Sequence, residues 1–140
     1  MGVKVTVKNL DRVQAKIRRV LKQAQETVRS IDGKRVVVGI PDSAHYPNGQ
    51  SVRSVAALVE YGTVKMAPRP FMRTCRAENK AKWWNQMRRE IRQVAKGKET
   101  ANDALLKVGA TMKADIRQTI TDYDAVDTGR LRNSFEVKVI

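Results

Sequence analysis

Three short segments of the chain have the hydrophobic pattern of a β-strand. Hydrophobic and polar residues alternate in two of them, and the third is mainly apolar. Every second residue is apolar in residues 3–8 and again in residues 135–139, which is typical of a strand with one exposed face. Residues 35–40 read RVVVGI, a β-branched run that predicts a buried strand. The first and last of these strands are candidates for sheet edges, where a second chain can pair.

Between the first and second predicted strands, apolar residues recur at steps of three and four, which predicts an amphipathic helix. This helix is expected from Leu10 to Ile31. Asn9 is its candidate N-cap, and Gly33 follows its expected end.

Three more helices are predicted in the rest of the chain. A short helix begins after Ser51 and stops at Gly62. After a connector, a long helix runs from Pro70 to about Ala95. Another long helix begins at Thr100, which opens a sequence similar to a capping box.

This order of elements predicts an α+β fold, in which a small, mostly antiparallel sheet packs against several helices, two of them long. A length of 140 residues suits one domain with a single core, so we assign residues 1–140 to one α+β domain. Within that domain, residues 1–33 form an N-terminal strand and helix, and residues 34–140 form the remaining core.

The charge balance is strongly basic, because 28 Lys and Arg against 14 Asp and Glu give a formal net charge of +14. Such an excess raises affinity for nucleic acid, anionic lipid or acidic protein surfaces without choosing among them. The single cysteine, Cys75, excludes a disulfide within the chain. Residues 1–10 lack the apolar core of a signal peptide, and no run is long enough to cross a bilayer. We therefore expect cytoplasmic synthesis and no membrane partner.

The long helix after Pro70 has one face whose chemistry changes halfway along. Four cations come first on this face, and apolar residues follow from Trp84 onward. The four cations are Arg69, Arg73, Arg76 and Lys80. Either the helix bends near residues 79–82, or its first half projects from the core and meets something else. Residues 65–98 contain eleven Lys or Arg against two acids, so the four cations are candidates for facing DNA or an acidic surface.

Two adjacent tryptophans lie in this helix and point about 100° apart. Trp84 fits the apolar line, so we expect it in the core. Trp83 falls toward the edge of that line, where it is either an interface anchor or a boundary residue.

Catalytic and metal-binding chemistry has little support. His45 and Cys75 are one candidate nucleophile pair, but no third, orienting group accompanies them, and they are too few for a zinc site. Asp127, Thr128 and Gly129 spell the aspartic-protease tripeptide without its apolar flanking strands or a second copy. A helix cap or turn is the better interpretation of that tripeptide, and a single helical turn is expected over Thr128 to Asn133. We expect no catalytic residue, no metal site and no cofactor.

Three segments, in their order and spacing, resemble a family of tailed-bacteriophage virion proteins. The segments are RVVVGI at 35–40, VAALVEYGTVKMAPRPFMR at 55–73 and DTGRLRNSF at 127–135. The family is described as tail-completion or neck proteins, minor tail protein Z-like proteins or virion morphogenesis proteins. The resemblance covers about residues 35–140, and the middle segment is the most specific.

The family's motifs match two groups of residues here. The first group, which we call the elbow (residues 60–71), matches a Glu-aromatic-Gly-Thr step followed by Pro-Arg-Pro-Phe. Its matching positions are Glu60, Tyr61, Gly62, Thr63, Pro68, Arg69, Pro70 and Phe71. The second group, which we call the C-terminal element, matches Thr-Gly-x-Leu-x-x-Ser at Thr128, Gly129, Leu131 and Ser134. The resemblance implies that both groups contact neighbouring subunits or partners.

The same resemblance implies a structural subunit without enzymatic activity or cofactor, which assembles into a ring of six or alternatively twelve copies. The ring would lie at the head–tail junction of the virion and be assembled in the host cytoplasm. It would join the tail tube or tail terminator protein to the head-completion or connector protein. DNA would pass through its lumen.

The elbow has a physical interpretation of its own. Gly62, Pro68 and Pro70 would fix the angle between two helices, and small angular errors accumulate around a ring. Arg69 would pair with an acid such as Glu60, in its own chain or the next. The alternative is that the segment only connects two helices.

Two other functions stay open. A sequence-independent nucleic-acid-binding module, acting as a monomer or dimer, explains the charge but not the elbow or the edge strands. A small hydrolase using Asp127 or Cys75 has little support.

Overall fold

The computed structural model describes residues 7–125 and 129–140. These residues form five helices and two strands, in the order α1 (Val7–Ile31), β1 (Val36–Gly39), α2 (Val52–Tyr61), α3 (Phe71–Ala95), α4 (Ala101–Asp122), α5 (Arg130–Asn133) and β2 (Glu136–Val139). The two strands pair antiparallel, with Val38 opposite Val137. The α+β class and the small antiparallel sheet are therefore confirmed.

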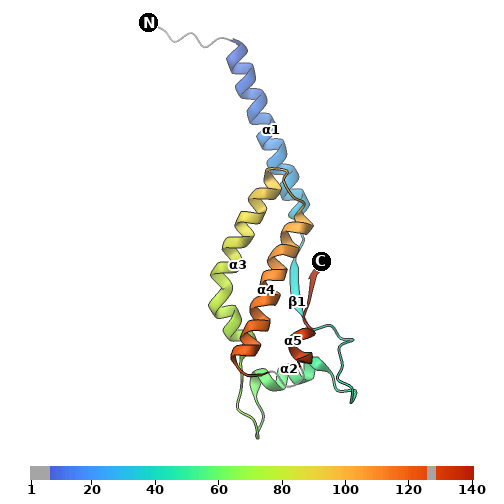
Figure 1. The fold of residues 1–140 in the computed structure, drawn as a ribbon. Helices are drawn as coiled ribbons and strands as arrows, with labels where there is room; N and C mark the ends of the chain where they lie inside the picture. The colour runs from blue at the N-terminus through green and yellow to red at the C-terminus, as the bar shows by residue number, and fades with distance from the viewer. Residues whose placement is uncertain (1–6, 126–128) are drawn as a thin grey trace.

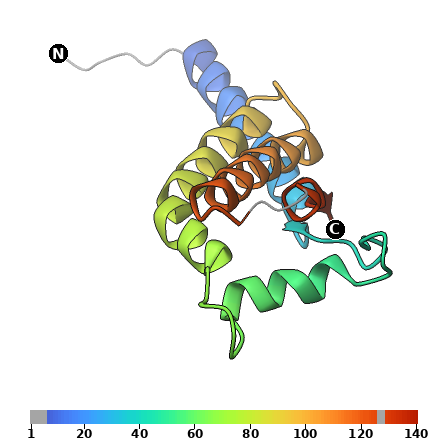
Figure 2. The same cartoon turned by 60° about the horizontal axis from the view of Figure 1, so that its bottom comes forward.

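Helix α4 is the centre of the fold. It lies alongside α3 on one side and packs against both strands on the other, and α2 crosses one end of the molecule (Figures 1 and 2). A Cβ atom at Gly109 of α4 would overlap the side chain of Val137 and lie 2.8 Å from Cγ2 of Val36. The absence of a side chain at Gly109 therefore sets how closely helix and sheet approach.

The main core lies at the end of the molecule where α2 and α5 meet α3 and α4. Its buried members are Ile40, Val52, Phe71, Cys75, Ile116, Ile120, Leu131 and Phe135. The rings of Phe71 and Phe135 meet edge to face, with centroids 6.4 Å apart. The start of α3 and the residue that precedes β2 are thus joined through one aromatic pair.

The predicted helix starts are confirmed at two caps. The Ser51 hydroxyl accepts a hydrogen bond from the Ser54 backbone N–H at 3.4 Å, and Thr100 accepts one from the Asp103 N–H at 3.2 Å. The predicted last strand also forms, as β2.

The N-terminal prediction needs correction. Residues 3–6 of the expected strand lie outside the described residues, while Val7 and Lys8 already belong to α1. Asn9 is therefore inside the helix and is not its cap. Val7 lies three residues before Leu10, so the helical period extends one turn further than the alternation of residues 3–8 indicated.

Strand β1 is less buried than its apolar sequence predicted. Only one face of the sheet packs on α4, and Val37 on the other face is 45% exposed. A continuous β-branched run predicts burial on both faces, but no second layer covers this sheet among the described residues.

Helix α3 is continuous, and its first half does not project from the core. Phe71 and Cys75 are buried near its start. Steps of four from Phe71 lead through Cys75 to Trp83, so Trp83 lies on the buried side and Trp84 is 57% exposed. The expectation that Trp84 lies in the core is wrong for this reason.

Helix α1 extends well beyond the rest of the molecule (Figure 1). Its C-terminal part lies against α3 and α4, where Thr27 is buried. No helix in residues 7–125 and 129–140 combines the length and apolar character needed to span a membrane.

Candidate interaction site at the elbow between α2 and α3

The elbow begins where Gly62 ends α2. Gly62 has a φ of 77°, and its N–H donates to the Leu58 carbonyl at 2.8 Å. A Cβ atom here would lie 2.8 Å from both the Met66 carbonyl oxygen and the Pro68 nitrogen. Positive φ and close backbone contact both require glycine at this position.

The chain then forms a small hairpin that projects from the molecule (Figure 1). The Thr63 N–H donates to the Met66 carbonyl at 2.8 Å, and the Met66 N–H donates back at 3.3 Å. The Thr63 hydroxyl also accepts from the Lys65 N–H at 3.2 Å. Val64, at the tip, is fully exposed. The hairpin therefore presents an apolar side chain to solvent on an ordered backbone.

Glu60 ties the end of α2 to the start of α3. Its side chain is buried, and its carboxylate accepts from the backbone N–H groups of Met72 at 2.9 Å and Arg73 at 3.2 Å. A carboxylate at a helix N-terminus satisfies unpaired N–H groups and interacts favourably with the helix dipole. Glu60 thus serves as a cap for α3 supplied by a different helix.

Arg73 closes this contact from the other side. Its Nε donates to the Glu60 carboxylate at 2.9 Å, and its Nη2 donates to the Glu60 carbonyl at 3.1 Å. Its guanidinium also lies 5.0 Å from the centroid of the exposed Tyr61 ring. Arg69 does not pair with Glu60 of its own chain, because the first turn of α3 places Arg73 next to that carboxylate. Pairing of Arg69 with an acid of a neighbouring chain stays a prediction.

Arg69 instead connects the elbow to the loop after α4. Its backbone N–H donates to the Val59 carbonyl at 2.7 Å, and its Nη1 donates to the Asp124 carbonyl at 2.9 Å. Pro70 then occupies the N-cap position of α3. Arg69, which lies between the two prolines, therefore attaches the elbow to α2 and to the loop after α4.

The C-terminal element lies next to this loop. Gly129 has a φ of 77° and precedes α5, Leu131 is buried, and the Ser134 hydroxyl donates to the Arg130 carbonyl at 2.5 Å. Thr128 lies outside the described residues, as does Asp127. The helical turn predicted around these positions is present as α5.

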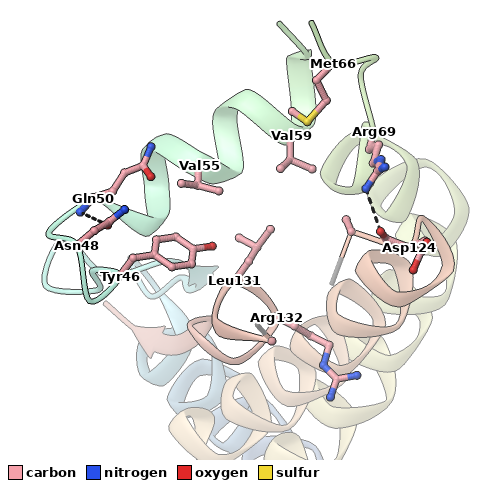
Figure 3. A pocket seen from close by; sticks show the side chains of 12 residues that line it. Tyr46, Asn48, Gln50, Val55, Val59, Met66, Arg69, Asp124, Leu131 and Arg132 are labelled. Atoms are coloured by element: carbon pink, nitrogen blue, oxygen red, sulfur yellow. Dashed lines mark hydrogen bonds between the residues drawn. The ribbon is translucent and has the colours of Figure 1, made fainter. Parts of the chain in front are cut away.

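The elbow and the C-terminal element meet at one cavity of about 460 Å³, although about 60 residues separate them in the sequence (Figure 3). Met66 and Arg69 line it from the elbow, and Gly129 and Leu131 line it from the C-terminal element. The wall is completed by side chains from the loop before α2, including Tyr46. The elbow and the C-terminal element therefore line a single surface region.

The four cations predicted to face DNA or acid separate into two pairs. Arg69 and Arg73 make the structural contacts described above. Arg76 and Lys80 are exposed and border an apolar groove that also contains Trp84. All four side chains are exposed, but only the second pair makes no contact within the elbow.

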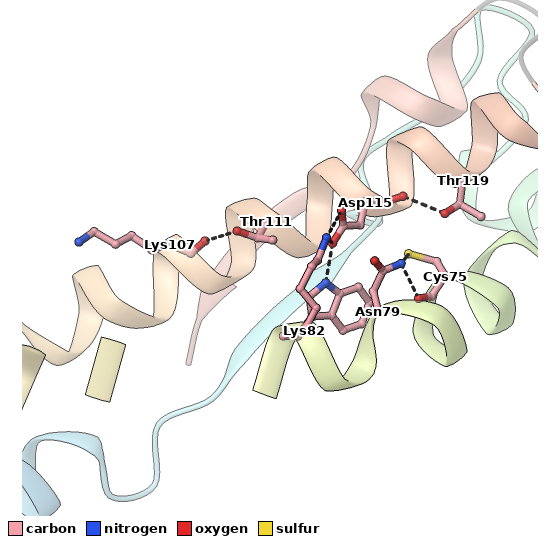
Figure 4. A network of polar contacts seen from close by, with 8 residues as sticks. Cys75, Asn79, Lys82, Lys107, Thr111, Asp115 and Thr119 are labelled. Carbon is pink, nitrogen blue, oxygen red and sulfur yellow. Dashed lines mark hydrogen bonds and ion pairs between the residues drawn. The ribbon is translucent and has the colours of Figure 1, made fainter. Parts of the chain in front are cut away.

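A polar contact between α3 and α4 was not predicted from the sequence. Lys82 Nζ and Trp83 Nε1 both donate to the Asp115 carboxylate at 2.7 Å (Figure 4). The sequence contained one indication, since Asp115 immediately precedes Ile116 on the apolar line of α4. The contact fixes the two long helices to each other beside the core.

A second cluster lies near the turn between α3 and α4. Lys107 Nζ lies 2.5 Å from the Glu99 carboxylate and 3.6 Å from Glu90. A hydrogen bond with Glu99, with burial and the like charge, raises the pKa of Glu90. The Lys107 hydrogen bond lowers the pKa of Glu99.

Cys75 and His45 have separate surroundings. Cys75 is fully buried in α3, burial raises the pKa of its thiol, and its sulfur contacts Asn79. His45 is exposed in the loop before α2, with Nδ1 3.0 Å from the Ser43 carbonyl. Within the described residues, no three His, Cys, Asp or Glu side chains are grouped to hold a metal ion.

Comparison with known proteins yields no relative: no protein-family model, curated protein or solved structure matches the chain.

Proposed function

We propose that this protein is a structural virion protein of a tailed bacteriophage that forms a ring at the head–tail junction. The ring has six copies and joins the tail tube or its terminator protein to the head-completion or connector protein. DNA passes through its lumen. The protein acts without catalysis or a cofactor and is assembled into the virion in the host cytoplasm.

The observation that supports this proposal best is the meeting of the elbow and the C-terminal element. Both resemble motifs of the phage family, and Met66, Arg69, Gly129 and Leu131 line one cavity. Residues that line the same cavity can contact the same neighbouring subunit. A shared surface region is what an interface with a neighbouring subunit requires.

The elbow also has the rigidity that a ring needs. The Glu60 carboxylate, the Arg73 side chain and the Arg69 contacts hold α2 and α3 at one angle. Closed rotational symmetry requires that angle to be equal in every copy. The exposed side chains of Tyr61 and Val64 lie on this fixed frame and are available to a neighbour.

The sheet offers a second contact of the same kind. Strands β1 and β2 pair only with each other among the described residues, so each has an outer edge. Such edges accept a further strand from another chain. A neighbouring subunit or a ring partner would supply it.

A second candidate is a sequence-independent nucleic-acid-binding module. The net charge of +14 and the exposed pair Arg76 and Lys80 favour it. Phosphate contacts by such cations would make binding steeply salt-dependent. The buried clamp around Glu60 has no role in this function, which is why we place it second.

Incorporation into particles tests the proposal. Gly62→Val and Phe71→Ala, which alter the elbow, should reduce assembly far more than they reduce DNA binding. Arg89→Ala, an exposed change on the second half of α3, is the control and should assemble normally. Normal incorporation of both elbow variants would contradict the interface role.

A further inference from the structure

Helix α1 exposes an apolar stripe that the rest of the chain leaves largely uncovered. Its members are Leu10, Val13, Ile17, Val20, Leu21 and Val28, each between 49% and 66% exposed. The N-terminal part of α1, which carries most of the stripe, extends beyond α3 and α4 (Figure 1). Such a row of large apolar side chains is costly in water and indicates a surface that another molecule covers.

The spacing of the stripe suits a second helix as the covering element. Two heptad positions are mainly apolar across three repeats. The first, position a, holds Leu10, Ile17, Ala24 and Ile31, and the second, position d, holds Val13, Val20 and Thr27. Leu21 and Val28 add position e to the same side. A seam of this kind packs knobs into holes against a second helix.

The distribution of charges on α1 suits pairing with a second copy of the same helix. Of the six cations in residues 9–31, five are at positions b, c and f, on the side away from the seam. These five are Arg12, Arg18, Arg19, Lys22 and Arg29. The flanking positions e and g hold one charge, Lys16. An identical helix requires flanks without opposed like charges, and the positions flanking this stripe meet that requirement. An anionic membrane also suits an apolar stripe with cations on the opposite face, so it is the competing outcome of the tests below.

We propose that α1 pairs with α1 of a second copy of this chain through the stripe. Pairing is centred on residues 10–21, because Thr27 and its surroundings already lie against α3 and α4 of the same chain. The cations then lie on the outer sides of the pair, and salt screens their mutual repulsion. Added salt should therefore strengthen this self-association, whereas it weakens binding to DNA.

This inference does not rest on the head–tail assignment. A ring whose α1 helices stay apart would keep the proposed function and remove this contact. A nucleic-acid-binding module that dimerises through α1 would keep this contact without the proposed function.

Crosslinking of the full chain tests the pairing directly. Ile17→Cys places a thiol on the seam, and Ala15→Cys at position f places one on the opposite side of the helix. With a short bismaleimide, Ile17→Cys should give a covalent dimer and Ala15→Cys should not. The unsubstituted chain is a further control, because its only thiol, Cys75, is fully buried. Absence of dimer from Ile17→Cys, or equal crosslinking of both variants, would overturn the proposal.

Sedimentation gives an independent readout. Ile17→Glu should raise the dissociation constant of self-association at least tenfold, while Lys22→Glu on the outer side should leave it unchanged or lower it. Unchanged circular dichroism would show that both variants fold, as expected for side chains far from the main core. Equal masses of wild type and both variants would overturn the proposal. Binding of the full chain to anionic vesicles through the stripe, without formation of a dimer, would also overturn it.

Discussion

Arg73, in the first turn of α3, donates from its Nε to the buried carboxylate of Glu60, near the end of α2, at 2.9 Å. The same carboxylate accepts two backbone N–H groups of α3. One side chain therefore caps a helix, forms an ion pair and sets the angle of the elbow.

Removing this carboxylate should destabilise the fold. Glu60→Ala leaves two N–H groups of α3 without their acceptor, and we expect a loss of about 2 kcal/mol in the free energy of unfolding. Glu60→Gln, which retains one acceptor oxygen, should lose about half as much. Urea denaturation measures both, with the exposed Glu78→Ala as control. Equal stability of Glu60→Ala and Glu78→Ala would contradict the clamp.

Glycine at position 62 should be needed for two separate reasons. Gly62→Ala combines a strained positive φ with a Cβ atom 2.8 Å from backbone atoms. Gly33→Ala has a similar φ of 72° but nothing within 4 Å of its Cβ, so it isolates the strain. We expect about 1 kcal/mol of destabilisation at Gly33 and about 2 kcal/mol or more at Gly62, measured by thermal unfolding. Similar losses at both positions would show that the close contact is absent.

Gly109→Ala should reverse the usual effect of this substitution. In a helix interior, glycine to alanine normally stabilises by up to about 1 kcal/mol. Here the new methyl group overlaps Val137 of β2, so we expect destabilisation of about 1–3 kcal/mol. The double variant Gly109→Ala, Val137→Ala should lose less than the sum of its single changes. Stabilisation by Gly109→Ala alone would contradict the close packing of α4 on the sheet.

Glu90→Gln should stabilise the protein at neutral pH. The pKa of Glu90 is raised in the folded state, so its contribution to stability is present at low pH and lost as pH rises through the folded pKa. Glutamine removes the like charge near Glu99, and we expect a gain of up to about 0.5 kcal/mol at pH 7. The gain should shrink toward pH 4, where the wild-type carboxyl is protonated. A gain in stability that does not change with pH would rule out like-charge repulsion between Glu90 and Glu99 as its cause.

The exposed hairpin tip should matter for assembly and not for folding. Val64 is fully exposed, so Val64→Asp should change the free energy of unfolding by less than about 0.5 kcal/mol. Particle incorporation should nevertheless fall, since an interface position would gain a buried charge. Lys98→Gln, also at an exposed position but far from the elbow in sequence, lowers the net charge by the same amount and is the control. Normal incorporation of Val64→Asp would place the tip outside any interface.

Local signals in the sequence predicted much of the fold. Ser51 and Thr100 were identifiable as caps because capping depends on neighbouring residues only. The period of α1 was also visible, but its first turn was not, since alternation in residues 3–8 competes with the helical pattern.

Contacts between distant segments were not predictable in the same way. Both Arg69 and Arg73 lie near Glu60 in sequence, and only the start of α3 decides which of them pairs with it. The meeting of the elbow with the C-terminal element depends on how α4 returns along α3. Periodicity predicted that the α1 stripe needs covering, but not that its own chain would leave it exposed.

The native mass of the purified chain, alone and mixed with tail tubes or head connectors, tests the central proposal most directly. A ring of about six subunits, formed alone or only on those particles, is the predicted result. A monomer or dimer that binds neither particle, yet binds DNA of any sequence with steep salt dependence, would contradict the ring and favour a basic nucleic-acid-binding module.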